Sequence, residues 1–235
     1  MDSNKVFQHF KERLDDACEN SPYFAQYLAS PYSSEYDLSF DCGLSIFTGA
    51  TRATIVDDDY DYVVKIDIDT DGSGENVCAR ELEIYNDAFN AGLGRCFAET
   101  QCLGLYTKKV WWYPDIDLQD MADEQDFLDL IYGEGYEPKK ITISFWLYGY
   151  EKADCERWEG CRSTPEERDF VSRQDSPLSE RSTDVACALL HQYGVETFID
   201  LGNFCRDHHV NDLHTGNVGY VDDRLVLIDF GGYWR

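Results

Sequence analysis

Two short runs rich in β-branched and aromatic residues, "VGYV" and "RLVLI", lie near the end of the chain and are separated by the polar sequence "DDR". Such runs around a short polar turn predict a β-hairpin. A hairpin brings the residues that flank it together at its open end. Here Asn217 precedes the first run and Asp229 follows the second, while Asp212 lies five residues before Asn217. We therefore expect these three polar side chains to converge on one small volume.

The three side chains suit phosphoryl transfer. Mg²⁺ prefers hard oxygen ligands and takes the remainder from phosphates and water, so Asn217 and Asp229 are candidate metal ligands. Asp212 is the candidate that orients or deprotonates an attacking hydroxyl. The alternative is that the three residues only stabilise a turn. We interpret His214 as a loop residue that orders this turn by hydrogen bonding, without a chemical role.

The sequence "DLHTGN", followed by "IDFG" with Asp229 twelve residues after Asn217, resembles the catalytic loop and metal-binding motif of the protein-kinase-like superfamily. Its form is closer to the aminoglycoside and choline phosphotransferases and to small phage kinases than to ordinary protein kinases. The resemblance implies ATP and Mg²⁺ as cofactors, with Asp212 as a catalytic residue and Asn217 and Asp229 as metal ligands. It implies transfer of a γ-phosphoryl group to a hydroxyl of a protein or small molecule.

The upstream half contains the other parts that this resemblance requires. Residues 44–68 read as strands, and "YVVKI" places Lys65 on one of them. The resemblance implies that Lys65 holds the α- and β-phosphates of the nucleotide. It also implies that the turn in "FTGATRATI", with Gly49, Thr51 and Arg52, covers the phosphates.

A helix predicted from about residue 75 to residue 90 follows these strands. It carries Glu81, which the resemblance implies forms an ion pair with Lys65 as part of the catalytic machinery. Glu83 is the competing partner. For the segment that contacts adenine, "WWYPDID" is the first choice and "WLYGYEKAD" the second.

The sequence departs from the family pattern at three places. The phosphate-covering turn has one glycine, Gly49, where the family has three. Val210 stands where the family usually has a histidine that supports the catalytic loop. Only "GYWR" follows Gly231, so the activation segment and peptide platform of ordinary protein kinases are not expected. Residues 115–190 are the expected replacement for that platform.

The fold class predicted from these patterns is α+β, a protein-kinase-like two-lobed fold. We expect an N-terminal helical segment at 1–40, an N-lobe with an antiparallel sheet at 41–114, and a reduced, mostly helical C-lobe at 115–235. The remaining patterns predict a helix at 3–18, two strands around a polar turn in "ETQCLGLYTKKVWWYPDI", a helix from Asp117 to near Gly133, a strand in "ITISFWLYGY", a loop with one short helix at 151–181, and two helices separated at Gly194, the first capped by Ser182.

The charge of the chain limits its partners. Asp and Glu number 46 against 20 Lys and Arg, which gives a formal net charge of −26. Such a surface repels nucleic-acid phosphates and anionic lipid, so direct binding to nucleic acid or to a membrane is not expected. Two further functions stay open: a catalytically weak, pseudokinase-like protein that mimics nucleic acid toward a basic partner, and transfer of AMP through the same site.

Cysteine usage and the absence of a signal sequence predict a cytoplasmic protein. The nine cysteines contain no C-x-x-C pair, which disfavours a zinc ribbon or a disulfide framework. The first twenty residues are charged and contain no apolar signal-peptide core. We therefore expect a reducing setting, in a host or bacterial cytosol.

Overall fold

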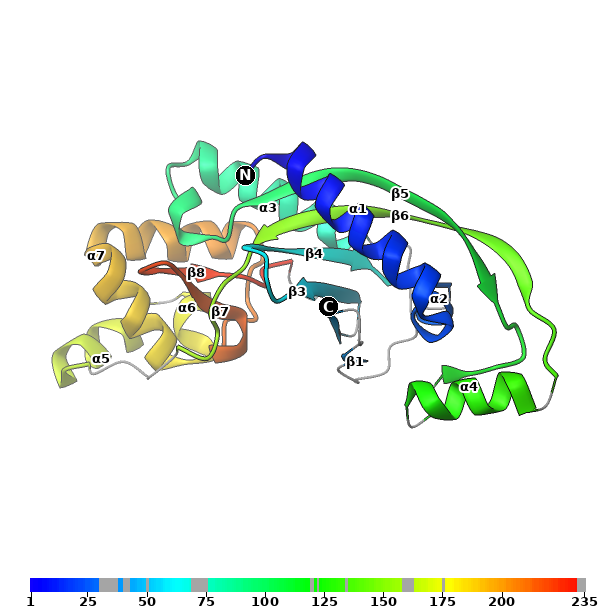
Figure 1. Cartoon of the computed structure of the whole chain (residues 1–235). Helices are drawn as coiled ribbons and strands as arrows, with labels where there is room; N and C mark the ends of the chain where they lie inside the picture. The colour runs from blue at the N-terminus through cyan, green and yellow to red at the C-terminus, as the bar shows by residue number, and fades with distance from the viewer. Residues whose placement is uncertain are drawn as a thin grey trace. The chain divides into compact units, whose positions relative to one another are not determined.

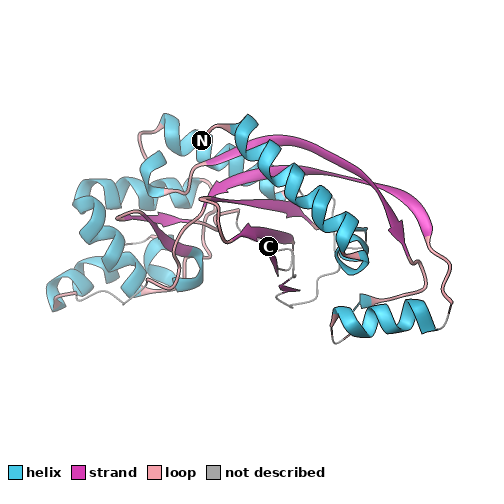
Figure 2. Ribbon diagram, viewed as in Figure 1, coloured by secondary structure: helices cyan, strands magenta, loops and turns pink. Residues whose placement is uncertain are grey.

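The computed structural model of the chain describes residues 1–29, 38–39, 43–49, 51–68, 76–118, 121, 123–133, 135–157, 163–174 and 176–231. Its class is α+β, with an antiparallel sheet and helices, as predicted (Figures 1 and 2). The chain divides into two compact units. The first comprises Met1–Cys78 and Gln101–Tyr150, and the second comprises Ala79–Thr100 and Glu151–Arg235. Residues 115–150 thus belong to the same unit as the strands predicted for the N-lobe. The reason is that the long strand Lys139–Glu151 is part of the same sheet as those strands.

The first unit is built on a six-stranded sheet with the order β1-β2-β3-β4-β6-β5. Its strands are β1 (Leu38–Ser39), β2 (Leu44–Thr48), β3 (Arg52–Asp57), β4 (Tyr62–Asp67), β5 (Thr100–Trp112) and β6 (Lys139–Glu151). Strands β1 to β4 pair as antiparallel neighbours, with Ile46 opposite Ile55 and Ile55 opposite Val64. These three side chains are fully buried. The strands predicted within residues 44–68 are therefore confirmed.

The helices of this unit are α1 (Ser3–Asn20), α2 (Pro22–Ala29) and α4 (Glu124–Gly133). Helix α1 confirms the predicted amphipathic helix and extends it by one half-turn. Its Val6, Phe10 and Leu14 are buried in the same hydrophobic core as the sheet residues. Asp2 caps the helix, because its side chain accepts a hydrogen bond from the Lys5 N–H at 3.3 Å.

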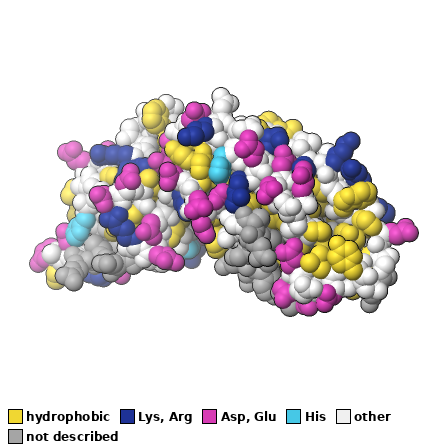
Figure 3. All heavy atoms as spheres, in the orientation of Figure 1, with side chains coloured by type: hydrophobic (Ala, Val, Ile, Leu, Met, Phe, Trp, Pro, Cys, Tyr) yellow, Lys and Arg dark blue, Asp and Glu magenta, His cyan; other side chains and the backbone are white. Residues whose placement is uncertain are grey.

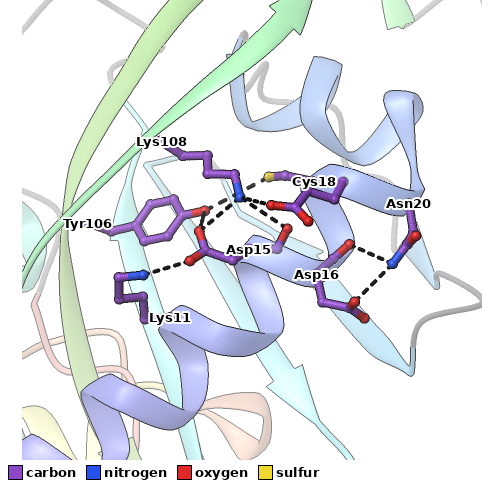
Figure 4. Close-up of polar contacts among 8 residues, drawn as sticks. Lys11, Asp15, Asp16, Cys18, Asn20, Tyr106 and Lys108 are labelled. Atoms are coloured by element: carbon purple, nitrogen blue, oxygen red, sulfur yellow. Dashed lines mark hydrogen bonds and ion pairs between the residues drawn. The ribbon is translucent and has the colours of Figure 1, made fainter.

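Polar side chains also fasten α1 to β5 (Figure 4). The buried Tyr106 hydroxyl donates to Asp15 Oδ1 at 3.1 Å, and Lys108 Nζ lies 3.3 Å from the same carboxylate and 2.6 Å from Glu19. The Cys18 Sγ is 4.0 Å from the Tyr106 hydroxyl. Burial raises the pKa of the Cys18 thiol to about 11, so this thiol stays protonated and unreactive at neutral pH.

A second polar contact joins α1 to the end of β3. The carboxylate of Asp57, almost fully buried, lies 3.0 Å from His9 Nε2 and 2.8 Å from Arg13 Nε. Burial by itself would raise the pKa of Asp57. Hydrogen bonds from the Asp59 N–H, His9 and Arg13 outweigh it and lower that pKa below its usual value. The His9 ring also stacks on Tyr60, with centroids 3.8 Å apart.

Helix α2 holds the outer end of β5 through one buried amide. Gln26 is fully buried; its Nε2 donates to the carbonyls of Tyr113 (2.9 Å) and Ile116 (3.2 Å), and its Oε1 accepts from the Tyr113 N–H. Close by, the Ser21 hydroxyl donates to Glu124 of α4 at 2.6 Å. The segment before α4 is therefore tied to α2, and the first turn of α4 is tied to the residue that precedes α2.

Two predictions for this unit were wrong in their boundaries. Residues 100–112 form one strand and not two around a turn. Gly104 has φ 146°, a conformation that lets the strand continue through an irregular position without turning back. Helix α4 begins at Glu124 and not at Asp117. The Asp123 carboxylate accepts the Asp126 N–H at 3.0 Å and so caps the helix at this later point.

The second unit packs its helices around its own hydrophobic core. It contains most of α3 (Val77–Asn90), then η1 (Gly94–Cys96), α5 (Pro165–Ser172), α6 (Pro177–Glu180), α7 (Thr183–Asp207), η3 (Thr215–Asn217), β7 (Val218–Val221) and β8 (Arg224–Leu227). Residues 165–180 thus hold two short helices where one was predicted. Ser182 caps α7, and Gly194 interrupts it with φ 78°, as the two-helix prediction required.

Among the described residues, no helix combines the length and hydrophobicity needed to cross a membrane. Cys18, Cys96, Cys102, Cys187 and Cys205 are free thiols. Cys42 and Cys161 lie outside the described residues.

Candidate functional site

The predicted C-terminal hairpin is confirmed. Strands β7 and β8 pair in antiparallel register, with Val218 opposite Leu227 and Val221 opposite Arg224. The pairing continues at the open end, where the Ile228 N–H donates to the Asn217 carbonyl at 3.1 Å. Asp229 is the next residue, so the hairpin brings Asn217 and Asp229 to the same end, as predicted.

The loop before the hairpin brings Asp212 to this end as well. The Asn217 side-chain amide donates from Nδ2 to the Asp212 carbonyl at 2.6 Å, and Asn217 is only 8% exposed. This bond uses the nitrogen end of the amide and leaves the oxygen for a ligand. An amide held in this orientation fits the role of a Mg²⁺ ligand, for which an oxygen is required.

His214 orders the turn by hydrogen bonding, as interpreted from the sequence. Its Nδ1 accepts the Gly216 N–H at 3.0 Å, and its carbonyl accepts the Asn217 N–H at 3.0 Å. A Cβ at Gly216 would lie 2.9 Å from the His214 ring, closer than ordinary contact allows. Gly216 is therefore the residue that lets His214 fold over its own turn.

The Asp212 side chain is partly exposed and lies near two basic groups. Its two oxygens are 3.9 Å from Arg181 Nε and 3.9 Å from His214 Nε2. Arg181 was not predicted as part of the site. It lies 31 residues upstream at the end of α6, and nothing in its local sequence distinguishes it from a solvated arginine.

Helix α3 supports the residues that follow Asp229. The carboxylate of Glu81 is fully buried, and its Oε1 accepts the N–H groups of Phe230 (2.8 Å) and Gly231 (3.1 Å). The neighbouring Arg80 donates to the carbonyls of Gly231 and His208, each at 2.9 Å. Glu81 thus holds the backbone beside the candidate metal ligand. Sequence reasoning missed Arg80, because its partners lie more than a hundred residues away.

Val210 lies just before the loop that carries Asp212, and it is a core residue. It is 1% exposed and belongs to the core of the second unit. Arg80 of α3 holds the backbone two residues earlier, through its bond to the His208 carbonyl. His209, one place away, adopts φ 56°, which marks a sharp turn of the backbone before the loop.

In the first unit, Lys65 lies on β4 as predicted, and it is not an ordinary surface lysine. It is 8% exposed, and its Nζ lies 4.3 Å from the centroid of the Tyr150 ring. It stands opposite Thr54 of β3, while the adjacent pair Val64 and Ile55 enters the core. Lys65 therefore belongs to the sheet surface opposite α1 and α2. Its predicted ion pair with Glu81 stays a prediction.

The turn between β2 and β3 is closed by Gly49, whose N–H donates to the Arg52 carbonyl at 2.8 Å. The Thr51 carbonyl accepts the Ile68 N–H at 2.8 Å, which ties the turn to the end of β4. Arg52 stands opposite Asp67 in the β3–β4 register. The predicted phosphate-covering turn is thus next to the lysine-bearing strand, and its role toward a nucleotide is untested.

No group of three or more His, Cys, Asp or Glu side chains that would hold a metal by itself occurs in the described ranges. Asn217 and Asp229 supply one amide and one carboxylate oxygen. Such a pair suits Mg²⁺ bound together with a polyphosphate, because Mg²⁺ takes its remaining ligands from phosphates and water.

Comparison with known protein families gives no match, and comparison with curated proteins gives no significant match. The function is therefore inferred from the residues and their local geometry.

Proposed function

We propose that the protein is an ATP- and Mg²⁺-dependent phosphotransferase with a protein-kinase-like, two-lobed fold. The observation that carries the proposal is the fixed amide of Asn217 at the open end of the β7–β8 hairpin, next to Asp212 and Asp229. Phosphoryl transfer asks for positioned ligands and electrostatic stabilisation more than for covalent chemistry from the protein. A loop held by His214, Asn217 and α3 meets that demand.

In this proposal each residue acts on a different part of the reaction. Asn217 and Asp229 would hold Mg²⁺, which would supply positive charge to the phosphates of the nucleotide. Asp212 accepts the proton of the acceptor hydroxyl. The hydroxyl oxygen bonds to the γ-phosphorus, the bond from that phosphorus to ADP breaks, and ADP leaves. Lys65 neutralises the α- and β-phosphates. The proposal thus requires Lys65 and Asp229 to act on the same nucleotide.

Thermal unfolding tests the binding step. ATP at about 100 times its dissociation constant stabilises a protein by about 2.7 kcal/mol. We expect a Mg²⁺-dependent rise in Tm with ATP that is lost in Asp229→Asn and in Lys65→Met. Asp200→Asn is the matched control, because Asp200 is an exposed residue of α7, twelve residues before Asp212. A native protein without any Tm shift would refute nucleotide binding.

The product distinguishes the remaining functions. Mass spectrometry after incubation with ATP separates a phosphoryl group from AMP by the mass added to the protein or acceptor. The alternative function, in which an acidic protein mimics nucleic acid toward a basic partner, rests on the net charge of −26. Figure 3 shows Asp and Glu side chains scattered over one face of the molecule. Salt-sensitive binding to a basic partner, without nucleotide binding, would favour it.

A further inference from the structure

The outer face of the β5–β6 ribbon is an exposed surface that carries none of the residues assigned above to phosphate, metal or acceptor hydroxyl. Strands β5 and β6 are each thirteen residues long, and they run side by side beyond the shorter β4 (Figure 1). Over the outer part of the ribbon, every side chain on one face is exposed. We call this the ribbon face, and it comprises Leu105, Thr107, Lys109 and Trp111 of β5 with Lys140, Thr142, Ser144 and Trp146 of β6.

Three contacts fix the register of the ribbon. Thr107 Oγ1 lies 3.0 Å from Ser144 Oγ, and Lys140 Nζ lies 5.3 Å from the centroid of the Trp111 ring. On the opposite face, the rings of Tyr106 and Phe145 are 5.2 Å apart. All three agree with one antiparallel register, which also places Leu105 opposite Trp146.

The ribbon face is apolar at both ends and basic near its outer end. Leu105, Trp111 and Trp146 are each about half exposed, at 49%, 54% and 49%. A paired set of large apolar side chains left open to water marks an interaction surface more often than scattered single residues do. Tryptophan is also a frequent anchor in protein interfaces.

The charge of the ribbon is opposite to that of the whole chain. Residues 100–112 and 139–150 contain no Asp or Glu, in a protein with 46 of them. Lys109, Lys139 and Lys140 are exposed and form no ion pair with the described residues. A chain with net charge −26 thus keeps one acid-free, basic segment. This segment complements an acidic partner.

The ribbon also lies at one edge of the sheet. β5 is the last strand in the order β1-β2-β3-β4-β6-β5, and within the described ranges no strand pairs with its outer edge. An edge strand of thirteen residues presents backbone N–H and carbonyl groups that another strand can pair with. Proteins use such edges to bind extended peptides by adding a strand.

We propose that the outer edge of β5 binds an extended, acidic peptide segment of another protein as an added strand. Carboxylates on one face of that strand would lie on the ribbon face, beside Lys109 and Lys140, and the apolar side chains that alternate with them would lie on the opposite face, with Tyr106. Only a polypeptide backbone pairs with a strand edge along its length, which disfavours nucleic acid and lipid. A second copy is disfavoured because two ribbons of the same positive charge would meet edge to edge.

The test uses the full chain and a fluorescein-labelled peptide of alternating Val and Glu, about as long as β5. Fluorescence anisotropy should show saturable binding, with at least about tenfold weaker binding of the matched Val–Gln peptide. N-methylation of one alternate set of peptide amides should abolish binding, while methylation of the other set should not. Only the amides that face β5 form the ladder, because amides alternate in direction along a strand.

Charge reversal on the protein locates the site. Lys109→Glu and Lys140→Glu should each weaken binding about fivefold, because each exchanges an attraction for a repulsion. Lys5→Glu is the matched control, since Lys5 is exposed on α1 and should change the affinity less than about twofold. Circular dichroism confirms that the variants are folded.

Other outcomes overturn the proposal. Equal binding of the two N-methylated peptides would show that no strand is added. An oligothymidylate or vesicles containing phosphatidylserine that bind more tightly than the Val–Glu peptide would identify nucleic acid or a membrane as the ligand. Concentration-dependent dimerisation that Lys140→Glu strengthens would identify a second copy. None of these results bears on nucleotide binding, so this proposal and the phosphotransferase proposal fail independently.

Discussion

Buried carboxylates hold a helix in both units of the molecule, but through different partners. In the second unit, Glu81 of α3 accepts backbone N–H groups from Phe230 and Gly231. In the first unit, Asp57 of β3 binds the side chains of His9 and Arg13 on α1. A bond to the backbone sets the path of the chain, whereas a bond to a flexible side chain only attaches one element to another. The first contact thus shapes the candidate site, and the second stabilises the fold.

The largest effect is expected for Glu81→Ala. It leaves two buried backbone N–H groups without this acceptor, which should lower the free energy of unfolding by about 3 kcal/mol. It should also abolish the Mg²⁺-dependent Tm shift with ATP, because the backbone beside Asp229 loses its support. Urea unfolding and the melts measure both. Glu83→Ala, an exposed change on the same helix, should have little effect. Similar losses of stability and of the Tm shift in the two variants would show that Glu81 does not support the candidate site.

A smaller effect is expected for Asn217→Ala. The variant loses the buried hydrogen bond to the Asp212 carbonyl, and we expect a loss of about 1.5 kcal/mol in unfolding free energy. Binding of ATP with Mg²⁺ should weaken, whereas binding of ATP with EDTA should not change. Asn203→Ala, at an exposed position of α7, is the control. Equal weakening with and without Mg²⁺ would argue against Asn217 as a metal ligand.

The smallest effect is expected for Arg13→Met, and it should depend on pH. The pKa of Asp57 is lowered in the folded protein, so its contribution to stability is present above its unfolded pKa and is lost as pH falls through the folded value. Near neutral pH we expect a loss of about 1 kcal/mol, shrinking below about pH 4. Urea unfolding across this range measures it. A difference that stays constant with pH would assign the loss to packing of the arginine stem.

Local patterns were enough to predict the hairpin and its neighbours. The turn sequence, the β-branched runs and the flanking polar residues all act over short distances, so Asn217 and Asp229 lie at the same end of the hairpin, as expected. The same holds for Ser182 and Gly194 in α7, because caps and helix breaks are set by single residues.

Long-range contacts were not predictable. Arg80 and Arg181 join the site through partners far along the chain, and their own sequences carry no signal of it. The strand β5 was divided wrongly because "TKK" resembles a turn by composition. Its residues in fact alternate, with Lys108 turned toward α1 and Lys109 exposed. The assignment of Lys65 to the reaction also depends on long-range geometry, and it stays a prediction.

The buried amide of Gln26 has a kinetic consequence. It joins α2 to the Tyr113 carbonyl across 87 residues, and such a contact forms only after a long loop has closed. Helix α2 has only eight residues, too few to persist alone in water. Its final docking should therefore follow the rate-limiting step of folding. Truncating Gln26 should accelerate unfolding and leave the refolding rate almost unchanged.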